Sequence, residues 1–136
     1  MSKIPPISGF PEWLPQQKIA EERIISTIKE IYTLHGFTPL ETRAVEHIST
    51  LTSKGDINKE IYTIRRAQDE DSSTSDSTLA LHFDLTIPFA RYVAQNFSEL
   101  DFPFKRHQLQ KVWRGERPQE GRFREFYQFD IDIVSI

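Results

Sequence analysis

The sequence predicts an α+β fold in which a mainly antiparallel β-sheet is flanked by helices. One observation is the helical spacing of apolar residues between positions 15 and 36, and a second is a set of short segments in which apolar and polar residues alternate. The third is a pair of strand-like segments, 106–114 and 122–134, whose connector is too short for a parallel crossover. We therefore expect one domain over residues 1–136 with a modest core.

The composition is that of an ordinary globular domain. Apolar residues make up 38% of the chain and charged residues 27%, and the formal net charge is −3. This charge argues against a surface built throughout to bind nucleic acid, without excluding a local basic site. The absence of cysteine excludes disulfides and thiolate metal sites. Without a signal-peptide core or an apolar run that could cross a bilayer, the sequence indicates a cytoplasmic protein.

The four histidines lack the spacing of a metal site. No HxxxH or HxH pair occurs among His35, His47, His82 and His107. A site built on them would need carboxylates from distant parts of the chain, so structural roles are the better interpretation and no protein-bound structural metal is expected.

The first part of the chain predicts an extended leader followed by a helix. Proline-rich residues 1–14 form the leader, and the helix starts at Pro15. Gly36 is typical of the position just after a helix ends. The apolar residues that recur at helical spacing, and that we expect to face a sheet, are Ile24, Ile25, Ile28, Ile31 and Tyr32.

The next segments predict short strands around a polar loop. A short strand is expected within 37–51, and residues 60–66 (EIYTIRR) alternate as another. The Ser- and Asp-rich residues 67–78 predict a mobile hairpin tip. Residues 79–85 (LALHFDL) predict the returning strand, with its leucines and Phe83 on the apolar side. Pro88 is expected in the first turn of a helix that ends near Asn96.

The last predicted strand has two chemically different faces. Alternation places Phe123, Tyr127, Phe129, Ile131 and Ile133 on a core face, and Arg122, Arg124, Phe126, Gln128, Asp130 and Asp132 on the other. At about 3.3 Å per residue, Phe126 and Asp132 lie roughly 20 Å apart. The polar face is therefore long enough for an extended ligand that has one anionic end and one cationic end.

Arginines are concentrated before this strand. Four arginines and no lysine occur between Arg114 and Glu125, and a guanidinium group is a rigid fork of donors that suits phosphate oxygens. A solvated hairpin with Arg–Glu pairs is the alternative, because glutamates are interleaved with the arginines. The one-sided polar face beyond Phe126 favours a ligand site.

The segment WRGERPQEGRFREF (113–126) resembles motif 2 of class II aminoacyl-tRNA synthetases. Arg114 and Glu116 match the arginine–glutamate pair of that motif, and Arg122 and Phe126 match the R-x-x-x-F that follows its loop. This segment, together with LHFDLTIPFARY (81–92) and YQFDID (127–132), is similar to the sequences of histidyl-tRNA synthetases in particular. The similarity covers essentially the whole chain.

The resemblance implies that ATP, with Mg²⁺, is a substrate of the site. It implies that Arg114 is catalytic and contacts both the ATP α-phosphate and the carboxylate of histidine. It further implies that Arg122 contacts the terminal phosphates, that Glu116 lies at the adenine end, and that Phe126 stacks on adenine.

The resemblance also implies a set of histidine-binding residues. Asp84 and Thr86 would hold the α-amino group, Gln128 would line the amino-acid pocket, and Asp132 would recognise the imidazole. Taken alone, Asp84 is better explained as the N-terminal cap of a helix. Phe126 could be ordinary core, and Gln128 and Asp132 could be exposed edge residues.

The resemblance places the chain at the N-terminal part of a class II catalytic domain, containing motifs 1 and 2. Motif 1, at the interface of a homodimer, would fall around residues 35–51, although its characteristic proline would align near Arg43. Nothing in the sequence matches motif 3 or the anticodon-binding domain. We therefore expect a free sheet edge, and little or no ligase activity from this chain alone.

The implied function is ATP-dependent attachment of L-histidine to tRNA(His) through a histidyl-adenylate, with no membrane partner. One alternative is the synthetase-like regulatory subunit of an ATP phosphoribosyltransferase, and another is a general RNA-binding module suggested by the arginines. The ligase is favoured because Arg114, Arg122, Phe126 and Gln128 are all present.

Overall fold

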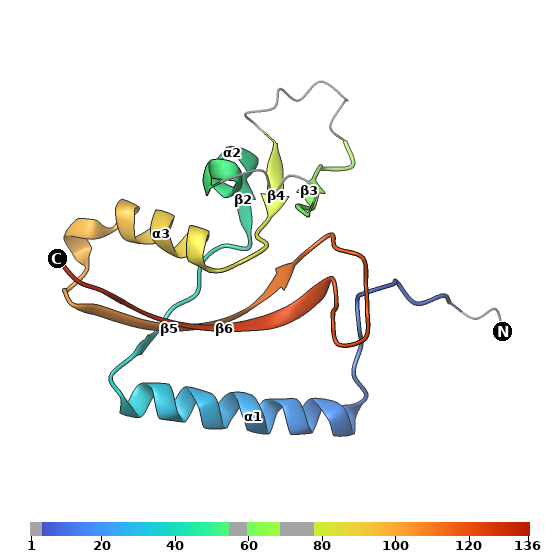
Figure 1. Ribbon diagram of the computed structural model, residues 1–136, viewed down its shortest axis with the longest axis horizontal. Coiled ribbons are helices and arrows are strands. Elements are labelled where there is room, and N and C mark those ends of the chain that lie inside the picture. The colour runs from blue at the N-terminus through green and yellow to red at the C-terminus, as the bar shows by residue number, and fades with distance from the viewer. Residues whose placement is uncertain (1–3, 55–59, 69–77) are drawn as a thin grey trace.

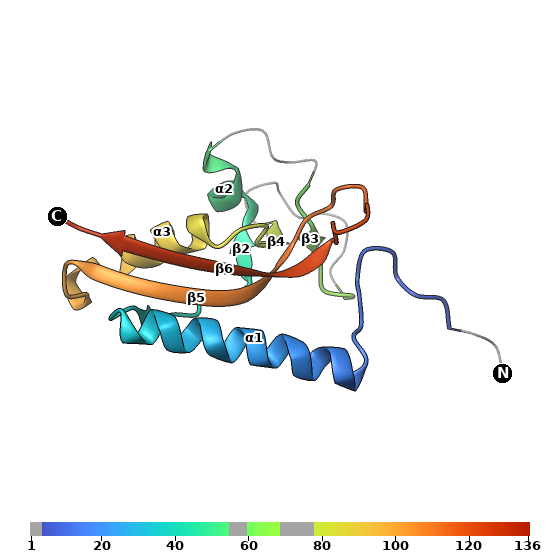
Figure 2. The ribbon, with the colours of Figure 1, turned by 60° about the horizontal axis from the view of Figure 1, so that its bottom comes forward.

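The computed structural model describes residues 4–54, 60–68 and 78–136. The strands form two three-stranded sheets, with the orders β1–β5–β6 and β2–β4–β3. Helix α1 covers one face of the β1–β5–β6 sheet, while α3 and the second sheet lie over its other face (Figures 1 and 2). Among these strands only the β1–β5 pair is parallel. The predicted α+β class with mainly antiparallel pairing is therefore confirmed.

The elements have the following bounds: α1 Pro15–Leu34, β1 Thr38–Pro39, β2 Val45–His47, α2 Ile48–Leu51, η1 Thr52–Lys54, β3 Thr63–Ile64, β4 Leu79–Leu81, α3 Thr86–Gln95, η3 Phe97–Glu99, β5 Phe104–Trp113 and β6 Glu125–Val134. No helix within the described ranges is both long enough and apolar enough to cross a membrane.

Helix α1 begins and ends where the sequence predicts. Pro15 occupies its first turn, and Gly36 follows it with a φ of +77°, a conformation that glycine adopts without strain. Ile25 is buried against the sheet, but Ile24 and Ile31 are largely exposed. These two residues lie roughly 100–120° around the helix from Ile25, so the prediction that they face the sheet is wrong.

Strands β3 and β4 pair as predicted but are much shorter than residues 60–66 and 79–85. After β4 the chain turns toward β5, where the Trp113 amide donates to the carbonyl of His82 (3.2 Å). Ala80 and His82 are fully buried while Leu79 is exposed, so the apolar side predicted for this strand is wrong at Leu79. Most of the predicted hairpin tip at 67–78 lies outside the described residues.

Strands β5 and β6 form the predicted antiparallel hairpin, with a register that runs from Phe104 opposite Val134 to Trp113 opposite Glu125. Strand β6 starts three residues later than predicted, because Arg122 pairs with Gln119 within the connector. In the described structure β6 is an edge strand, as expected.

The hydrophobic core lies around the second sheet rather than beneath β6. Its buried residues are Leu51, Ala80, Phe83 and Ile87, from α2, β4 and the start of α3. The predicted core face of β6 is wrong in part, since Ile131 is 45% exposed and Ile133 59% exposed. Among the described elements, α1 is the helix that lies under this face, and none of the described strands pairs with the outer side of β6 (Figure 1).

Candidate functional site

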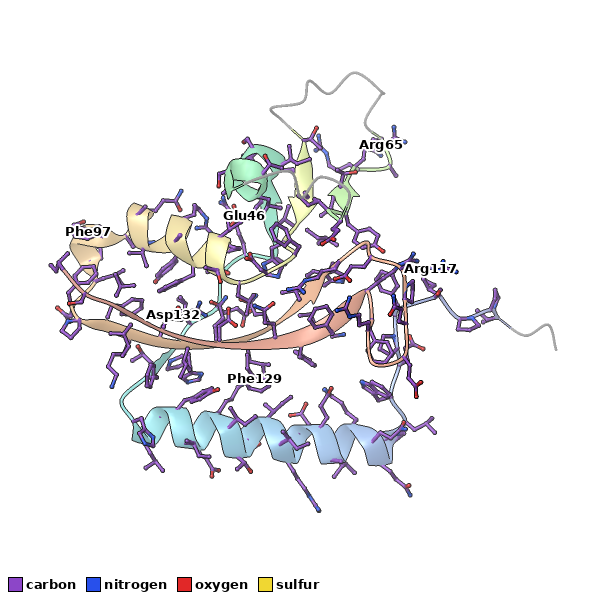
Figure 3. All side chains as sticks on the ribbon, viewed as in Figure 1. Glu46, Arg65, Phe97, Arg117, Phe129 and Asp132 are labelled. Atoms are coloured by element: carbon purple, nitrogen blue, oxygen red, sulfur yellow. The ribbon has the colours of Figure 1, made fainter. Side chains whose placement is uncertain are left out.

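The hairpin register brings polar residues of two strands onto one face of the sheet. The pairs on that face, which we call the polar face, are Arg106 with Asp132, Gln108 with Asp130, Gln110 with Gln128, and Val112 with Phe126. Figure 3 shows Asp132 on the α3 side of the sheet and Phe129 on the α1 side. The predicted one-sided display is therefore confirmed from Phe126 to Asp132.

Arg114 lies at one end of the polar face, just after β5. Its Nε donates to the carbonyl oxygen of Phe83 (3.0 Å), and its Nη2 lies 3.5 Å from Oε1 of Gln128. Its guanidinium carbon is 5.1 Å from the ring centre of Phe126. These contacts come from the turn before α3 and from β6, so a half-buried cation is held in a fixed position between two parts of the fold.

Asp84 lies in the same turn. Its Oδ1 accepts a long hydrogen bond from the backbone N–H of Ile87 (3.4 Å), although Leu85, not Asp84, holds the N-cap position of α3. Burial raises the pKa of Asp84, and the Ile87 amide and the Arg114 charge partly offset that rise. Thr86, the first residue of α3, is exposed beside it. Asp84 therefore makes one long contact with the first turn of α3 without being its N-cap, while the Arg114 charge acts on the same carboxylate.

The opposite end of the polar face is anionic. The side-chain amide of Gln128 donates to both carboxylate oxygens of Asp130 (3.1 and 3.2 Å). Asp132 Oδ2 lies 2.5 Å from Nη2 of Arg106, whose side chain is fully buried. Sequence reasoning gave no role to Arg106, although alternation within 106–114 places it on the same face as Gln108.

The connector residues are arranged differently. The closest polar contact of the Arg122 side chain is with Glu116 (3.3 Å), and this arginine is 68% exposed. Arg124 donates through Nε to the Glu116 carbonyl (2.9 Å) and through its amide to the Gly9 carbonyl (2.7 Å). The structure therefore brings Glu116 to Arg122, as the Arg–Glu hairpin interpretation predicted, and does not place Arg122 and Arg124 on the β6 polar face.

Gly9 is a second feature that sequence reasoning missed. Its φ is +84°, and a Cβ there would lie 2.8 Å from Cγ of Arg124. The leader can pack this closely on the connector because the residue is glycine. A glycine within a proline-rich leader was the available signal.

His82 links the turn that carries Asp84 to strand β5. Its Nε2 lies 2.8 Å from the carbonyl oxygen of Lys111, and its ring stacks on Trp113 at 5.6 Å. Burial lowers the pKa of His82, which favours the neutral ring with the proton on Nε2 as donor. His82 thus ties the segment that carries Asp84 to the end of β5 that carries Arg114.

Within the described ranges, no three His, Asp or Glu side chains come together in a way that could hold a metal ion.

Comparison with known proteins identifies the family of the chain. The family model described as "Histidyl-tRNA synthetase" matches residues 9–134. The chain belongs to the histidyl-tRNA synthetase family. The resemblance seen in residues 81–92 and 113–132 is thereby confirmed over nearly the whole chain.

Several relatives in this family are close. A histidine–tRNA ligase from Thermobifida fusca (strain YX) is 56% identical over 131 residues, which are 96% of this chain and 30% of that protein. One from Cutibacterium acnes (strain DSM 16379 / KPA171202) is 54% identical over 99% of this chain and 30% of the relative. The chain thus spans about 30% of the length of the curated relatives it matches.

Solved structures agree on the fold. The crystal structure of histidyl-tRNA synthetase from Nostoc sp. PCC 7120 matches with a TM-score of 0.84 and 40% identity, over 98% of this chain and 29% of that one. A structure from Bacillus halodurans C, described as an ATP phosphoribosyltransferase regulatory subunit/histidyl-tRNA synthetase, matches with a TM-score of 0.77 over 96% of this chain and 32% of that one. At 22% identity, that likeness shows a shared fold alone. The fold is that of the class II catalytic domain, in part.

Proposed function

We propose that the protein to which this chain belongs is a histidine–tRNA ligase, which uses ATP to attach L-histidine to tRNA(His). The observation that carries the proposal is the position of Arg114. Its guanidinium is held against Phe83, Gln128 and Phe126 at the junction between the turn that carries Asp84 and the polar face. Family membership and the names of the relatives support the same activity.

In the first step, a carboxylate oxygen of histidine attacks the α-phosphorus of ATP. A bond forms between histidine and the phosphoryl group, and the bond to pyrophosphate breaks. Negative charge accumulates on the non-bridging oxygens, where a fixed guanidinium stabilises it without having to reorganise. Arg114 is the group that we assign to this role, in contact with both the histidine carboxylate and the α-phosphate.

The remaining ATP contacts follow from the connector and from β6. We assign the stacking surface for adenine to Phe126, and the terminal phosphates to Arg122, whose exposed side chain would exchange Glu116 for phosphate oxygens. Glu116 is assigned to the adenine end. The phosphates themselves would carry Mg²⁺, since nucleotide-bound Mg²⁺ takes few ligands from protein.

Histidine would lie along the polar face, with its α-ammonium group at Asp84 and Thr86. Gln128 would line the pocket, and Asp132 would accept a hydrogen bond from an imidazole N–H. A site that must satisfy buried polar groups rejects analogues that lack the matching N–H. This recognition explains why an amide and carboxylates occupy a face that could have been apolar.

In the second step, a hydroxyl of the terminal ribose of tRNA(His) attacks the carbonyl carbon of the adenylate and AMP leaves. We further propose a cytoplasmic homodimer as the working form. Its interface is expected around residues 35–51, where the resemblance places motif 1.

Exchange of labelled pyrophosphate into ATP by the full-length protein tests the first step. Each of the twenty amino acids is supplied in turn, and only histidine is expected to support exchange. Absence of exchange with histidine would contradict the proposal and would favour the regulatory-subunit alternative. Complementation of a strain that lacks its histidine–tRNA ligase is the matching test of the complete reaction.

A further inference from the structure

Arg106 is a buried cation at the anionic end of the polar face. It is 0% exposed, and its guanidinium carbon lies 4.1 Å from the ring centre of Phe89 on α3. Its Nη1 donates to Oε1 of Gln108 (2.8 Å). Its Nη2 lies 2.5 Å from Oδ2 of Asp132 and 3.8 Å from Oδ2 of Asp130.

Burying the charge of Arg106 costs desolvation free energy. Removing a guanidinium from water is unfavourable unless opposite charges compensate, and replacing a buried ion pair with apolar residues is often neutral or stabilising. Two carboxylates face one guanidinium here, so the cluster carries one negative charge in excess. Stability alone gives little reason to place three charged groups at this end of the sheet, and ligand recognition gives a better one.

The cluster also fixes the side chains that the proposed function uses. Arg106 engages one oxygen of Asp132, Oδ2, and thereby restricts the rotation of the carboxylate. Asp130 accepts both hydrogen bonds from the Gln128 amide nitrogen, which leaves Oε1 of Gln128 directed toward Arg114. A continuous line of contacts therefore joins the buried arginine to the arginine assigned to catalysis.

We propose that Arg106 and Asp130 are positioning residues for histidine recognition. This inference rests on the proposed function. Arg106 holds Asp132 so that its Oδ1 accepts the imidazole N–H, and Asp130 holds Gln128 in the orientation that meets the amino acid and Arg114. The excess negative charge of the cluster favours a ligand end that donates hydrogen bonds.

The test uses the full-length protein and histidine-dependent ATP–pyrophosphate exchange, with Arg106→Leu and Asp130→Asn as variants. Loss of positioning raises the KM for histidine by about tenfold or more, while the KM for ATP changes by less than about twofold. Arg106→Lys, which keeps the charge without the planar fork, restores part of the loss.

Lys105→Met is the matched control. Lys105 is the neighbouring cation of β5 on the opposite face, where its Nζ donates to the His35 carbonyl (2.6 Å). This variant removes a charge and a hydrogen bond from the same strand but none from the polar face. Both KM values are expected to stay at the wild-type level.

The outcomes separate the inference from the function on which it rests. A wild-type protein without histidine-dependent exchange overturns the proposed function, and the inference with it. An active wild-type protein whose two variants keep the wild-type KM for histidine, or lose affinity for ATP and histidine equally, overturns the inference alone. If Arg106→Leu does not fold, Asp130→Asn decides, because it preserves the shape of the side chain while it removes the charge and one of the two oxygens that accept from Gln128.

Discussion

The β5–β6 hairpin buries polar side chains on one face and exposes apolar side chains on the other. On the polar face of the central strand β5, Arg106 and Gln108 are no more than 1% exposed, whereas on the α1 side of the edge strand β6, Ile131 and Ile133 are about half exposed. A hairpin selected only for stability would bury its isoleucines and expose its arginine. The difference indicates that the polar face is built to hold groups in place, and that the apolar face remains available for packing.

The two glutamines of β5 on the polar face are held by hydrogen bonds with Thr42. The Thr42 amide donates to Oε1 of Gln110 (3.0 Å), and Nε2 of Gln110 donates back to the Thr42 carbonyl (2.8 Å). Nε2 of Gln108 donates to the Thr42 hydroxyl oxygen (3.0 Å). Buried polar networks of this kind rigidify a site, because each member restricts the rotamers of the next.

Arg114→Ala removes the central cation from the polar face. The kcat for histidine-dependent exchange is expected to fall by about 100- to 1000-fold, the usual effect of losing one donor that stabilises a transition state. Arg114→Lys keeps the charge but loses the fork, so an intermediate rate is expected. A kcat close to wild type for Arg114→Ala would show that the polar face has no part in activation.

Glu46→Gln tests how much a buried ion pair between β2 and α3 contributes to the free energy of unfolding. Glu46 is buried between Arg91 (2.6 Å) and Arg43 (2.8 Å), and Figure 3 shows it beside α3. The variant leaves Arg91 with little solvent and without its counter-charge, and is expected to lower the free energy of unfolding by about 3 kcal/mol.

Glu22→Gln is the control on the α1 side. It breaks an exposed pair with Lys18 (2.9 Å), and such pairs contribute at most about 1 kcal/mol. Urea unfolding of the full-length protein, followed by circular dichroism, measures both variants. Equal midpoints for the two would contradict the contrast between the faces.

His82 predicts how stability depends on pH. Because burial lowers its pKa in the folded protein, the unfolded chain binds more protons below its ordinary pKa of 6.5. Stability is therefore expected to fall as pH drops from about 6.5, by at most about 1.4 kcal/mol per pH unit. Unfolding midpoints of wild type and His82→Gln between pH 7.5 and 5 measure this slope, which the variant should reduce. An unchanged slope would assign the dependence to other groups, such as His107, whose pKa burial also lowers.

Ile133→Thr gives the smallest expected effect. Its side chain is 59% exposed on the α1 side, so the free energy of unfolding should change by no more than about 0.5 kcal/mol. Val112→Ala, on the buried polar face, should cost about 1–2 kcal/mol through two lost methyl groups and the cavity that they leave. Thermal midpoints of the two variants measure the contrast, and a larger loss for Ile133→Thr would show that the apolar face is covered in the complete protein.

The sequence predicted those parts of the fold that depend on local geometry. Alternation along β6 located Gln128, Asp130 and Asp132 on one face, because side-chain direction in a strand needs no knowledge of the rest of the molecule. The prediction was wrong at Arg122, which forms an isolated antiparallel bridge with Gln119 in the connector and so lies outside the strand. It also overestimated the burial of Ile133, because coverage of a face depends on which elements pack there.

The site was only partly predictable for a related reason. Arg106 was not singled out because its partner, Asp132, follows it by 26 positions in the numbering and meets it only through the hairpin register. Glu46 depends in the same way on Arg91 of α3. The sequence motifs identified Arg114 and Asp84 as site residues. The contacts that position them could not be predicted, because Arg114 is held by the carbonyl of Phe83 and Asp84 by the backbone amide of Ile87.

The decisive measurement is a crystal structure of the full-length protein with histidine and an ATP analogue that cannot be cleaved between its α- and β-phosphates. We predict histidine along the polar face, with its imidazole N–H bonded to Asp132, its ammonium group at Asp84, and the α-phosphate on Arg114. Histidine bound on the α1 side of the sheet, or bound with its imidazole away from Asp132, would contradict this prediction.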